Sequence, residues 1–230
     1  MFIAGMQKLT LLDFPGVVAC TLFTAGCNFR CPWCHNAGLV LPEEASDRLL
    51  ESGEVLSFLE KRKGVLDGVC VTGGEPLLQP DLADFLRKVK GMGYAVKLDT
   101  NGMLPRRLSE VLATKLVDYV AMDIKSSPDG YAAATGTDAD VSVVSDSLSL
   151  LRQSGIPYEL RTTAVRGIHT EADFAAIGEW IGEVPAYFIQ RFVDSGQLLG
   201  SGFEAFSPEE MECLLTTVRK WIPSAQLRGV

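Results

Sequence analysis

The 230-residue sequence has no excess of basic residues, because 21 Lys and Arg stand against 29 Asp and Glu and give a net charge of −8. A nucleic-acid surface needs clustered Lys and Arg, so we expect no nucleic-acid partner. No apolar run approaches the ~18 to 20 residues that span a bilayer, and residues 1–16 have no basic stretch ahead of an apolar one. We therefore expect neither a membrane span nor a signal peptide.

Cysteine is scarce but clustered. The chain has 6 cysteines and 2 histidines, and half of the cysteines fall within "CNFRCPWCHN" at residues 27–36. We expect a cytoplasmic, reducing location, where clustered thiols indicate a metal or catalysis and disulfides are rare. The remaining cysteines lie in apolar surroundings and are expected to be small buried hydrophobes. They are Cys20, Cys70 and Cys213.

The chain alternates between β-rich runs and helical patterns, which predicts an α/β fold with parallel strands and outer helices. We expect a partial barrel of six βα units, in one domain over 1–230 with a core over about 14–222. The predicted strands are 17–24, 68–73, 94–100, 117–125, 157–165 and 186–192. The predicted helices are 47–63, 80–91, 105–115, 142–154, 170–182 and 207–221.

Polar signatures follow the first four predicted strands. They are the cysteine loop, "TGGEP" at 72–76, "LDTNG" at 98–102 and "MDIK" at 122–125. In parallel βα folds the carboxyl ends of the strands meet at one edge, where ligands bind. The four segments together therefore predict a site.

Two metal centres are compatible with Cys27, Cys31 and Cys34. In a zinc site, His35 would complete a set of three Cys and one His, but Cys34 and His35 are neighbours and no second ligand pair is present. An iron–sulfur cluster with three cysteine ligands would leave one iron open to an external ligand. The adjacency of Cys34 and His35 and the lack of a second ligand pair favour the cluster over zinc.

The segment "CNFRCPWC" resembles the CxxxCxΦC signature of radical S-adenosylmethionine (SAM) enzymes, with Trp33 at the aromatic position and "GGEP" after the next strand. Residues 7–36 further resemble the activating enzymes of glycyl-radical proteins, most of all the longer form of the anaerobic ribonucleoside-triphosphate reductase activating protein. The resemblance extends over essentially the whole chain. One departure is "FIQRF" at 188–192, where Gln190 and Arg191 stand in the stretch in which pyruvate formate-lyase activases carry a histidine.

The resemblance implies a barrel of the radical SAM type and a [4Fe–4S] cluster on Cys27, Cys31 and Cys34, with SAM bound to the open iron. An electron from a flavodoxin- or ferredoxin-type donor would cleave SAM to methionine and a 5′-deoxyadenosyl radical. That radical would take a hydrogen atom from a glycine of a partner glycyl-radical enzyme, which we expect to be an anaerobic ribonucleotide reductase.

The resemblance also implies a set of SAM contacts. The GGE segment would meet the methionyl amine, two acids would lie near the ribose and the carboxylate with a monovalent cation between them, and a lysine would offset negative charge. An ordinary turn or helix caps would explain the same glycines and acids without a ligand. Arg161 and Thr162 would face SAM or form a surface pair. The expected contacts are Trp33, His35, Gly73, Gly74, Glu75, Asp99, Asp123, Lys125 and Arg161.

Two other functions stay open on the sequence alone. A radical SAM enzyme acting on a small molecule in cofactor biosynthesis would need a polar pocket beyond the SAM residues. A non-enzymatic module with structural zinc would need four donors converging on one ion.

Overall fold

One sheet organises the computed structural model, which describes residues 1–40, 49–194, 196 and 198–230. Within these residues the sheet has 8 strands, and their order in the sheet is their order in the chain. β1 runs antiparallel to β2, and every later neighbour is parallel. The strands are β1 (Ile3–Thr10), β2 (Ala19–Thr24), β3 (Gly68–Gly73), β4 (Ala95–Thr100), β5 (Tyr119–Asp123), β6 (Tyr158–Ala164), β7 (Tyr187–Arg191) and β8 (Ala225–Arg228).

The six predicted strands are confirmed as β2 to β7, and β1 and β8 were not predicted. β1 contains Gly5, exposed Gln7 and Lys8, and two register shifts against β2, so it shows no alternation of apolar and polar residues. β8 has only four residues. Both are edge strands, whose formation depends on a neighbour more than on local preference.

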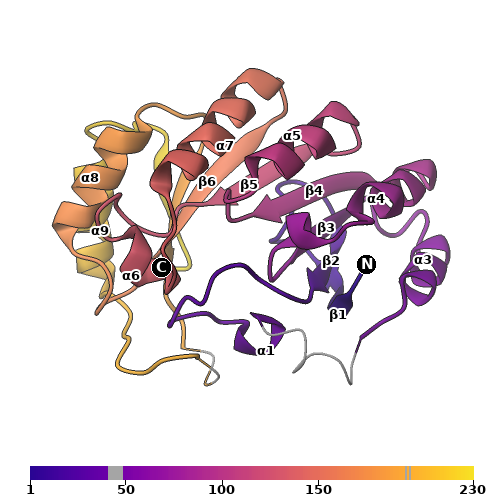
Figure 1. Ribbon diagram of the computed structural model, residues 1–230, viewed down its shortest axis with the longest axis horizontal. Helices are drawn as coiled ribbons and strands as arrows, with labels where there is room; N and C mark the ends of the chain where they lie inside the picture. Colours follow the sequence, from indigo (N-terminus) through magenta and orange to yellow (C-terminus); the bar gives the residue numbers. More distant parts are fainter. Residues whose placement is uncertain (41–48, 195, 197) are drawn as a thin grey trace.

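The longer helices lie along the outer side of the curved sheet, whereas the short α1 (Ala37–Val40) lies below it (Figure 1). Thr170 and Ser207 each form a reciprocal capping box, which satisfies backbone N–H groups at the start of the helix that follows. The six predicted helices are confirmed. Five have shorter bounds than predicted, the helix predicted over 142–154 begins one residue earlier, and residues 47–48 of the first prediction lie outside the described residues. The helices are α3 (Ser52–Glu60), α4 (Leu82–Gly91), α5 (Pro105–Ala113), α7 (Val141–Ser154), α8 (Glu171–Ile181) and α9 (Pro208–Val218), with the unpredicted short helices α1 (Ala37–Val40), η2 (Pro76–Leu78) and α6 (Tyr131–Thr135).

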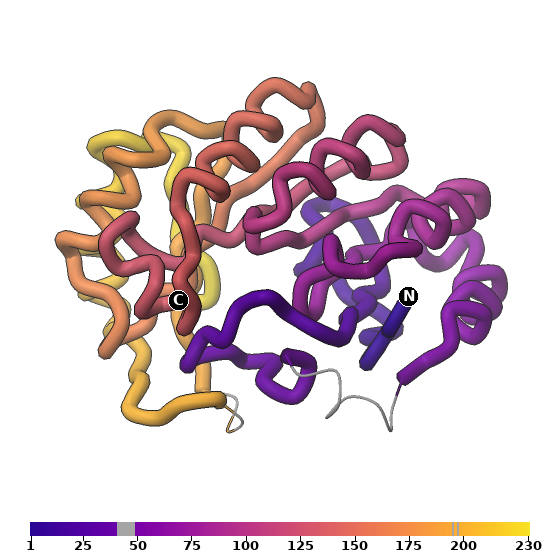
Figure 2. The backbone as a smooth tube through the Cα atoms, viewed as in Figure 1, coloured from indigo at the N-terminus to yellow at the C-terminus, as the bar shows by residue number. Residues whose placement is uncertain are grey.

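The sheet stays open, because β1 and β8 are its two edges and do not pair with each other in the described part of the chain. The segment after β2 runs beneath the sheet toward α6 (Figure 2), where Arg30 N donates to Thr135 O at 2.8 Å. This segment carries the clustered cysteines. The cysteine loop thus lies across the open end of a partial barrel. Among the described residues, no helix is long and apolar enough to cross a membrane.

The interior of the barrel is polar on alternate strand positions. In β6, Glu159 is 1% exposed and accepts hydrogen bonds from both terminal nitrogens of Arg228, each at 3.1 Å, and from Tyr119 Oη at 3.2 Å. Arg228 belongs to β8 and its side chain is half-buried, so this ion pair with the buried Glu159 ties the last strand to the middle of the sheet. Arg161, two residues after Glu159, lies on the same face of the sheet and is part of the site described next.

Candidate functional site

The predicted site residues gather around one cavity of about 430 Å³ at the carboxyl ends of the strands. Thr100 and Asp123 end β4 and β5, and Gly73 ends β3, as the positional argument requires. Except for Glu75, every residue of the predicted set lines the cavity. These are Cys27, Cys31, Trp33, Cys34, His35, Gly73, Gly74, Asp99, Asp123, Lys125 and Arg161.

One backbone hydrogen bond and one side-chain hydrogen bond hold the cysteine loop at its two ends. Gly26 N donates to Leu39 O at 2.7 Å, and the indole Nε1 of Trp33 donates to Ala134 O at 3.1 Å. Cys27 and Cys34 are half-buried and Cys31 is buried, with all three sulfurs free of disulfides. Burial raises the pKa of the Cys31 thiol to about 12, although nearby Lys125 opposes the rise. A metal would therefore have to displace protons from these thiols.

The other cysteines lie outside the cavity lining. Cys20 and Cys70 are fully buried in the core, as predicted. Cys213 is exposed on α9, so the prediction of a buried Cys213 was wrong. The helix turns this position to solvent, and a single cysteine with apolar chain neighbours does not reveal which face it occupies.

The glycines of "TGGEP" allow the chain to approach itself. A Cβ atom at Gly73, where φ is +116°, would lie 2.2 Å from Thr24 N, and one at Gly74 would lie 2.0 Å from Gly26 O. Gly74 N donates to Thr24 O and Glu75 N donates to Gly26 O, each at 2.8 Å. The pair of glycines therefore clamps the base of the cysteine loop against β3, while both glycines still face the cavity.

Glu75 does not line the cavity, although the sequence placed it at the ligand. Its side chain is completely buried and accepts from Leu77 N at 3.1 Å, Thr100 Oγ1 at 2.9 Å and Asn101 N at 2.7 Å. Burial raises its pKa to about 7, against the effect of these donors. The carboxyl group thus fixes the turn after β4.

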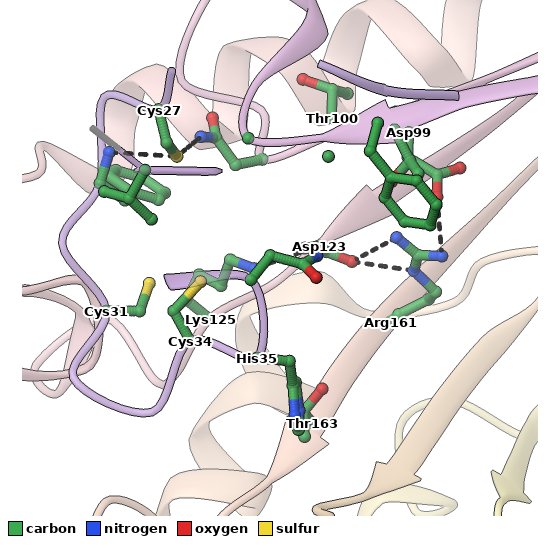
Figure 3. A pocket seen from close by; sticks show the side chains of 18 of the residues that line it. Cys27, Cys31, Cys34, His35, Asp99, Thr100, Asp123, Lys125, Arg161 and Thr163 are labelled. Atoms are coloured by element: carbon green, nitrogen blue, oxygen red, sulfur yellow. Dashed lines mark hydrogen bonds and ion pairs between the residues drawn. The ribbon is translucent and has the colours of Figure 1, made fainter. Parts of the chain in front are cut away.

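A network of charges crosses the cavity floor. Arg161 bridges two acids, with Nη2 2.8 Å from Asp123 Oδ1 and Nη1 3.2 Å from Asp99 Oδ2 (Figure 3). Asp99 also pairs with Lys97, and Asp123 accepts from Lys125 Nζ at 2.9 Å. In this network three cations therefore face two carboxylates. The Arg161 guanidinium occupies the position between the acids where a monovalent cation was expected.

The charges keep both acids ionised. Burial alone would raise the pKa of each carboxyl group, but Arg161, with Lys97 or Lys125, brings the pKa of both Asp99 and Asp123 below its ordinary value. Arg161 lies on the cavity wall and not in a surface pair. Thr162, on the opposite face of β6, is buried and donates to Ile124 O at 2.8 Å.

Aromatic rings flank the last cysteine. Lys125 Nζ lies 5.4 Å from the centre of the Trp33 ring, and the His35 ring lies 6.5 Å from Trp33 and 5.2 Å from Phe192. Burial lowers the pKa of His35, and Lys125 lowers it further. A neutral imidazole and an indole thus present flat surfaces to the cavity, which suit a planar heteroaromatic ring.

The donor set fits an iron–sulfur cluster better than a single ion. Within the described residues, no three His, Cys, Asp or Glu side chains converge on a point that could hold one metal ion. A cluster takes thiolates that surround a cube, and three thiols from one loop face the same cavity. Cys27 Sγ accepts from Phe29 N at 3.4 Å, a contact that suits a charged sulfur.

Residues outside the predicted set also line the cavity. They are Gln7, Asp13, Thr21 and Thr163, together with Gln190 of β7, which the sequence marked only as a departure from the pyruvate formate-lyase activases. Asp13 accepts from Thr21 Oγ1 at 2.5 Å. Thr21, Thr163 and Gln190 lie within predicted strands, where alternation would have marked the inward positions. Gln7 and Asp13 belong to β1 and its loop and gave no such signal.

The family model of the radical SAM superfamily matches residues 21–181, a span that begins within β2 and ends at the last residue of α8. The chain belongs to the radical SAM superfamily. Membership implies a [4Fe–4S] cluster and SAM as cofactors, and the three cysteines of this radical SAM chain fall inside the matched span.

Among curated proteins, this radical SAM chain is similar to one from Methanocaldococcus jannaschii that carries the name glycyl-radical enzyme activating enzyme. The two are 31% identical over 195 residues, 83% of this chain and 79% of that one. It is 36% identical over 140 residues to the pyruvate formate-lyase-activating enzyme of Clostridium pasteurianum, 58% of this chain and 57% of that one. It is 32% identical over 152 residues to a protein named GTP 3′,8-cyclase in Saccharolobus solfataricus, 65% of this chain and 48% of that one.

Solved structures share the fold. SuiB of Streptococcus suis superposes with a TM-score of 0.67 at 12% identity, covering 89% of this chain and 47% of SuiB. The structure of anSMEcpe with bound AdoMet gives a TM-score of 0.62 at 15% identity, covering 85% of this chain and 57% of that one. This radical SAM chain therefore spans about half the length of SuiB and of the GTP 3′,8-cyclase relative.

Proposed function

We propose that this radical SAM chain activates a glycyl-radical enzyme, and that its partner is an anaerobic ribonucleotide reductase. The observation that carries the proposal is the match to the M. jannaschii relative, which covers 83% of this chain and 79% of that protein. The match to the GTP 3′,8-cyclase relative leaves about half of that protein without a counterpart in this chain.

In the proposed reaction, Cys27, Cys31 and Cys34 would hold the cluster. The cluster would supply the one electron that cleaves the C5′–S bond of SAM, and the 5′-deoxyadenosyl group would become 5′-deoxyadenosine by taking a hydrogen atom from the Cα of a partner glycine, on which the unpaired electron would remain. A flavodoxin- or ferredoxin-type protein is the proposed electron donor. The chain itself contributes positioning and exclusion of water.

The charged groups suit the ends of SAM. Lys125 and Arg161 present positive charge to the cavity and suit the methionyl carboxylate, whereas Asp99 and Asp123 suit the amine and the ribose hydroxyls. The Glu75 carboxylate, being buried, serves this site by fixing the turn at Asn101. A monovalent cation near these acids stays a prediction.

The aromatic and glycine residues complete the proposed SAM site. The Trp33 and His35 rings suit the adenine, and the backbone at Gly73 and Gly74 allows SAM to approach closely.

The size of the cavity supports a macromolecular substrate. Pockets that enclose one drug-sized ligand measure roughly 300 to 1,000 Å³, and this cavity, at about 430 Å³, has to hold SAM beside the cysteine loop. Little enclosed space is left for a second small molecule. A glycine-bearing loop could instead enter from the open end of the sheet.

One observation favours a second function. The cavity carries polar groups beyond the proposed SAM contacts, among them Asp13, Thr163 and Gln190. Such groups suit a small polar substrate, and a GTP 3′,8-cyclase is among the similar proteins. A radical SAM enzyme acting on a small molecule is therefore the alternative.

Electron paramagnetic resonance distinguishes the two functions. Reconstituted protein, dithionite, SAM and an anaerobic ribonucleotide reductase should give a glycine-centred radical, seen as a doublet split by the remaining α-hydrogen. Replacing the partner's radical-bearing glycine by alanine should abolish the doublet. A SAM-cleaving preparation that forms no protein radical on any glycyl-radical enzyme, but turns over GTP or another small molecule, would establish the alternative.

A further inference from the structure

The sulfur of Cys27 has a different environment from the other two cysteine sulfurs of the loop. Cys27 Sγ accepts from Phe29 N at 3.4 Å and from Asn101 Nδ2 at 3.9 Å, and the dashed lines at Cys27 in Figure 3 mark these contacts. In the described part of the chain, the sulfurs of Cys31 and Cys34 accept no hydrogen bond. One ligand of the proposed cluster therefore receives two N–H donors.

The orientation of the Asn101 amide follows from its neighbours. Its Oδ1 accepts from Met103 N at 3.0 Å, so the NH₂ group must lie on the other side. There it donates to Asn28 Oδ1 at 2.8 Å and faces the Cys27 sulfur. Turning the amide over would place its oxygen against Asn28 Oδ1 and the sulfur, and its nitrogen against the Met103 N–H.

Buried contacts fix the Asn101 backbone. Asn101 is 5% exposed, and its N–H donates to the buried Glu75 carboxylate at 2.7 Å. Gly102 O, in the same turn, accepts from Ser147 Oγ at 2.6 Å. The turn after β4 is thus held from two sides, and the amide keeps its place beside the cysteine loop without help from a ligand.

We propose that Asn101 is a positioning residue for Cys27 and that its amide N–H raises the reduction potential of the cluster. The inference rests on the proposed cluster at Cys27, Cys31 and Cys34. A reduced cluster carries one more negative charge, so an N–H dipole directed at a ligand sulfur stabilises the reduced form more than the oxidised form. The same amide holds Asn28, the residue after Cys27, and so orders the start of the loop.

The test compares Asn101→Ala and Asn101→Asp with wild type after anaerobic reconstitution with iron and sulfide. Iron and sulfide contents are measured first, and the midpoint potential is then found by titration monitored by electron paramagnetic resonance. The N–H stabilises the reduced form more than the oxidised form, so Asn101→Ala should lower the ratio of reduced to oxidised cluster, by up to about tenfold at a fixed potential. For a one-electron couple a tenfold change is a fall of ~59 mV.

Asn101→Asp keeps the size of the side chain and the acceptor for Met103 N, but it replaces the donor by a negative charge. Its midpoint should fall further than that of Asn101→Ala. If Asn101→Ala does not assemble a cluster, the midpoint of Asn101→Asp alone tests the proposal. Ser147→Ala is the matched control, because it loosens the same turn without touching the amide, and its midpoint should equal that of wild type.

Midpoints in both Asn101 variants equal to wild type, with full iron content, would overturn the inference and leave the proposed function standing. An equal fall in Ser147→Ala would also overturn it, because the effect would then belong to the turn and not to the N–H donor. Wild-type protein that takes up no four-iron cluster would overturn the proposed function and this inference with it.

Discussion

Replacing Arg161 by methionine tests the charge network at its central residue. Arg161 has a side chain that is 14% exposed, and it contacts Asp99, which is 10% exposed, and Asp123, which is 29% exposed. Methionine keeps much of the length of the side chain and removes the charge. Both acids then lose one cation but keep another, since Lys97 stays beside Asp99 and Lys125 beside Asp123.

The expected loss follows from that arrangement. Removing one partner of a buried ion pair lowers the free energy of unfolding by ~3 to 5 kcal/mol when the other charge is left without a partner. Because each acid keeps a lysine, we expect the lower end, about 3 kcal/mol. Urea unfolding at pH 7 should show this as a midpoint lower by ~1 M, taking a slope near 3 kcal/mol per M. Arg87→Met is the control, because its ion pair with Asp84 is exposed on both sides and is worth ~0 to 1 kcal/mol.

The pH dependence gives an independent measurement. The folded protein lowers the pKa of both acids, so their contribution to stability is present above the ordinary carboxyl pKa and is lost as the pH falls below it through the lowered folded-state pKa. Wild-type stability should therefore decline below about pH 4, and Arg161→Met should decline less. Equal midpoints for Arg161→Met and Arg87→Met, or parallel pH curves for Arg161→Met and wild type, would refute the reasoning.

Three further predictions concern other parts of the chain. Cys34→Ala should abolish assembly of a four-iron cluster measured by iron content and visible absorption, whereas Cys213→Ala should retain it; normal assembly in Cys34→Ala would contradict the ligand assignment. Burial raises the pKa of Glu75 to about 7, so the folded state binds its proton more tightly than the unfolded chain, and stability should fall as the pH rises from about 4.5 to 7. In Glu75→Gln, the free energy of unfolding measured with denaturant should not fall over this pH range. The same pH dependence in Glu75→Gln as in wild type would show that a group other than Glu75 causes the fall. Arg228→Ala should lose ~3 kcal/mol of unfolding free energy by leaving the Glu159 carboxylate unpaired in the interior, and adding Glu159→Gln should recover part of it; additive losses would show that the two charges are not coupled.

Local sequence predicted the central sheet because β2 to β7 are β-rich runs bounded by turn residues. It also predicted the edge of the sheet at which the site lies, since parallel strands bring their carboxyl ends together. The edge strands were missed: β1 and β8 form against a neighbour, and Gln7, Lys8 and Gln226 give no apolar alternation.

Side-chain direction was harder to predict than position. Glu75 follows two glycines at a strand end, as a ligand-binding acid would, but it turns into the core toward the backbone of Asn101. The glycines themselves are required by the close approach of Thr24 and Gly26, residues about 50 positions earlier in the chain. The bridge that Arg161 makes between two acids likewise depends on strand register, which the sequence does not state.

The agreement between strand order and chain order has a consequence for synthesis of the protein. Each strand pairs with one already made, so the sheet can grow from the N-terminus without waiting for a distant segment, which shortens the search for contacts. The cysteine loop follows β2, but Glu75, Asn101 and Arg161 arrive with β3, β4 and β6. The three thiols are therefore exposed on a nascent chain until more than half of it has been made. Insertion of iron and sulfide before β6 is in place would occur without the charges that later surround the site.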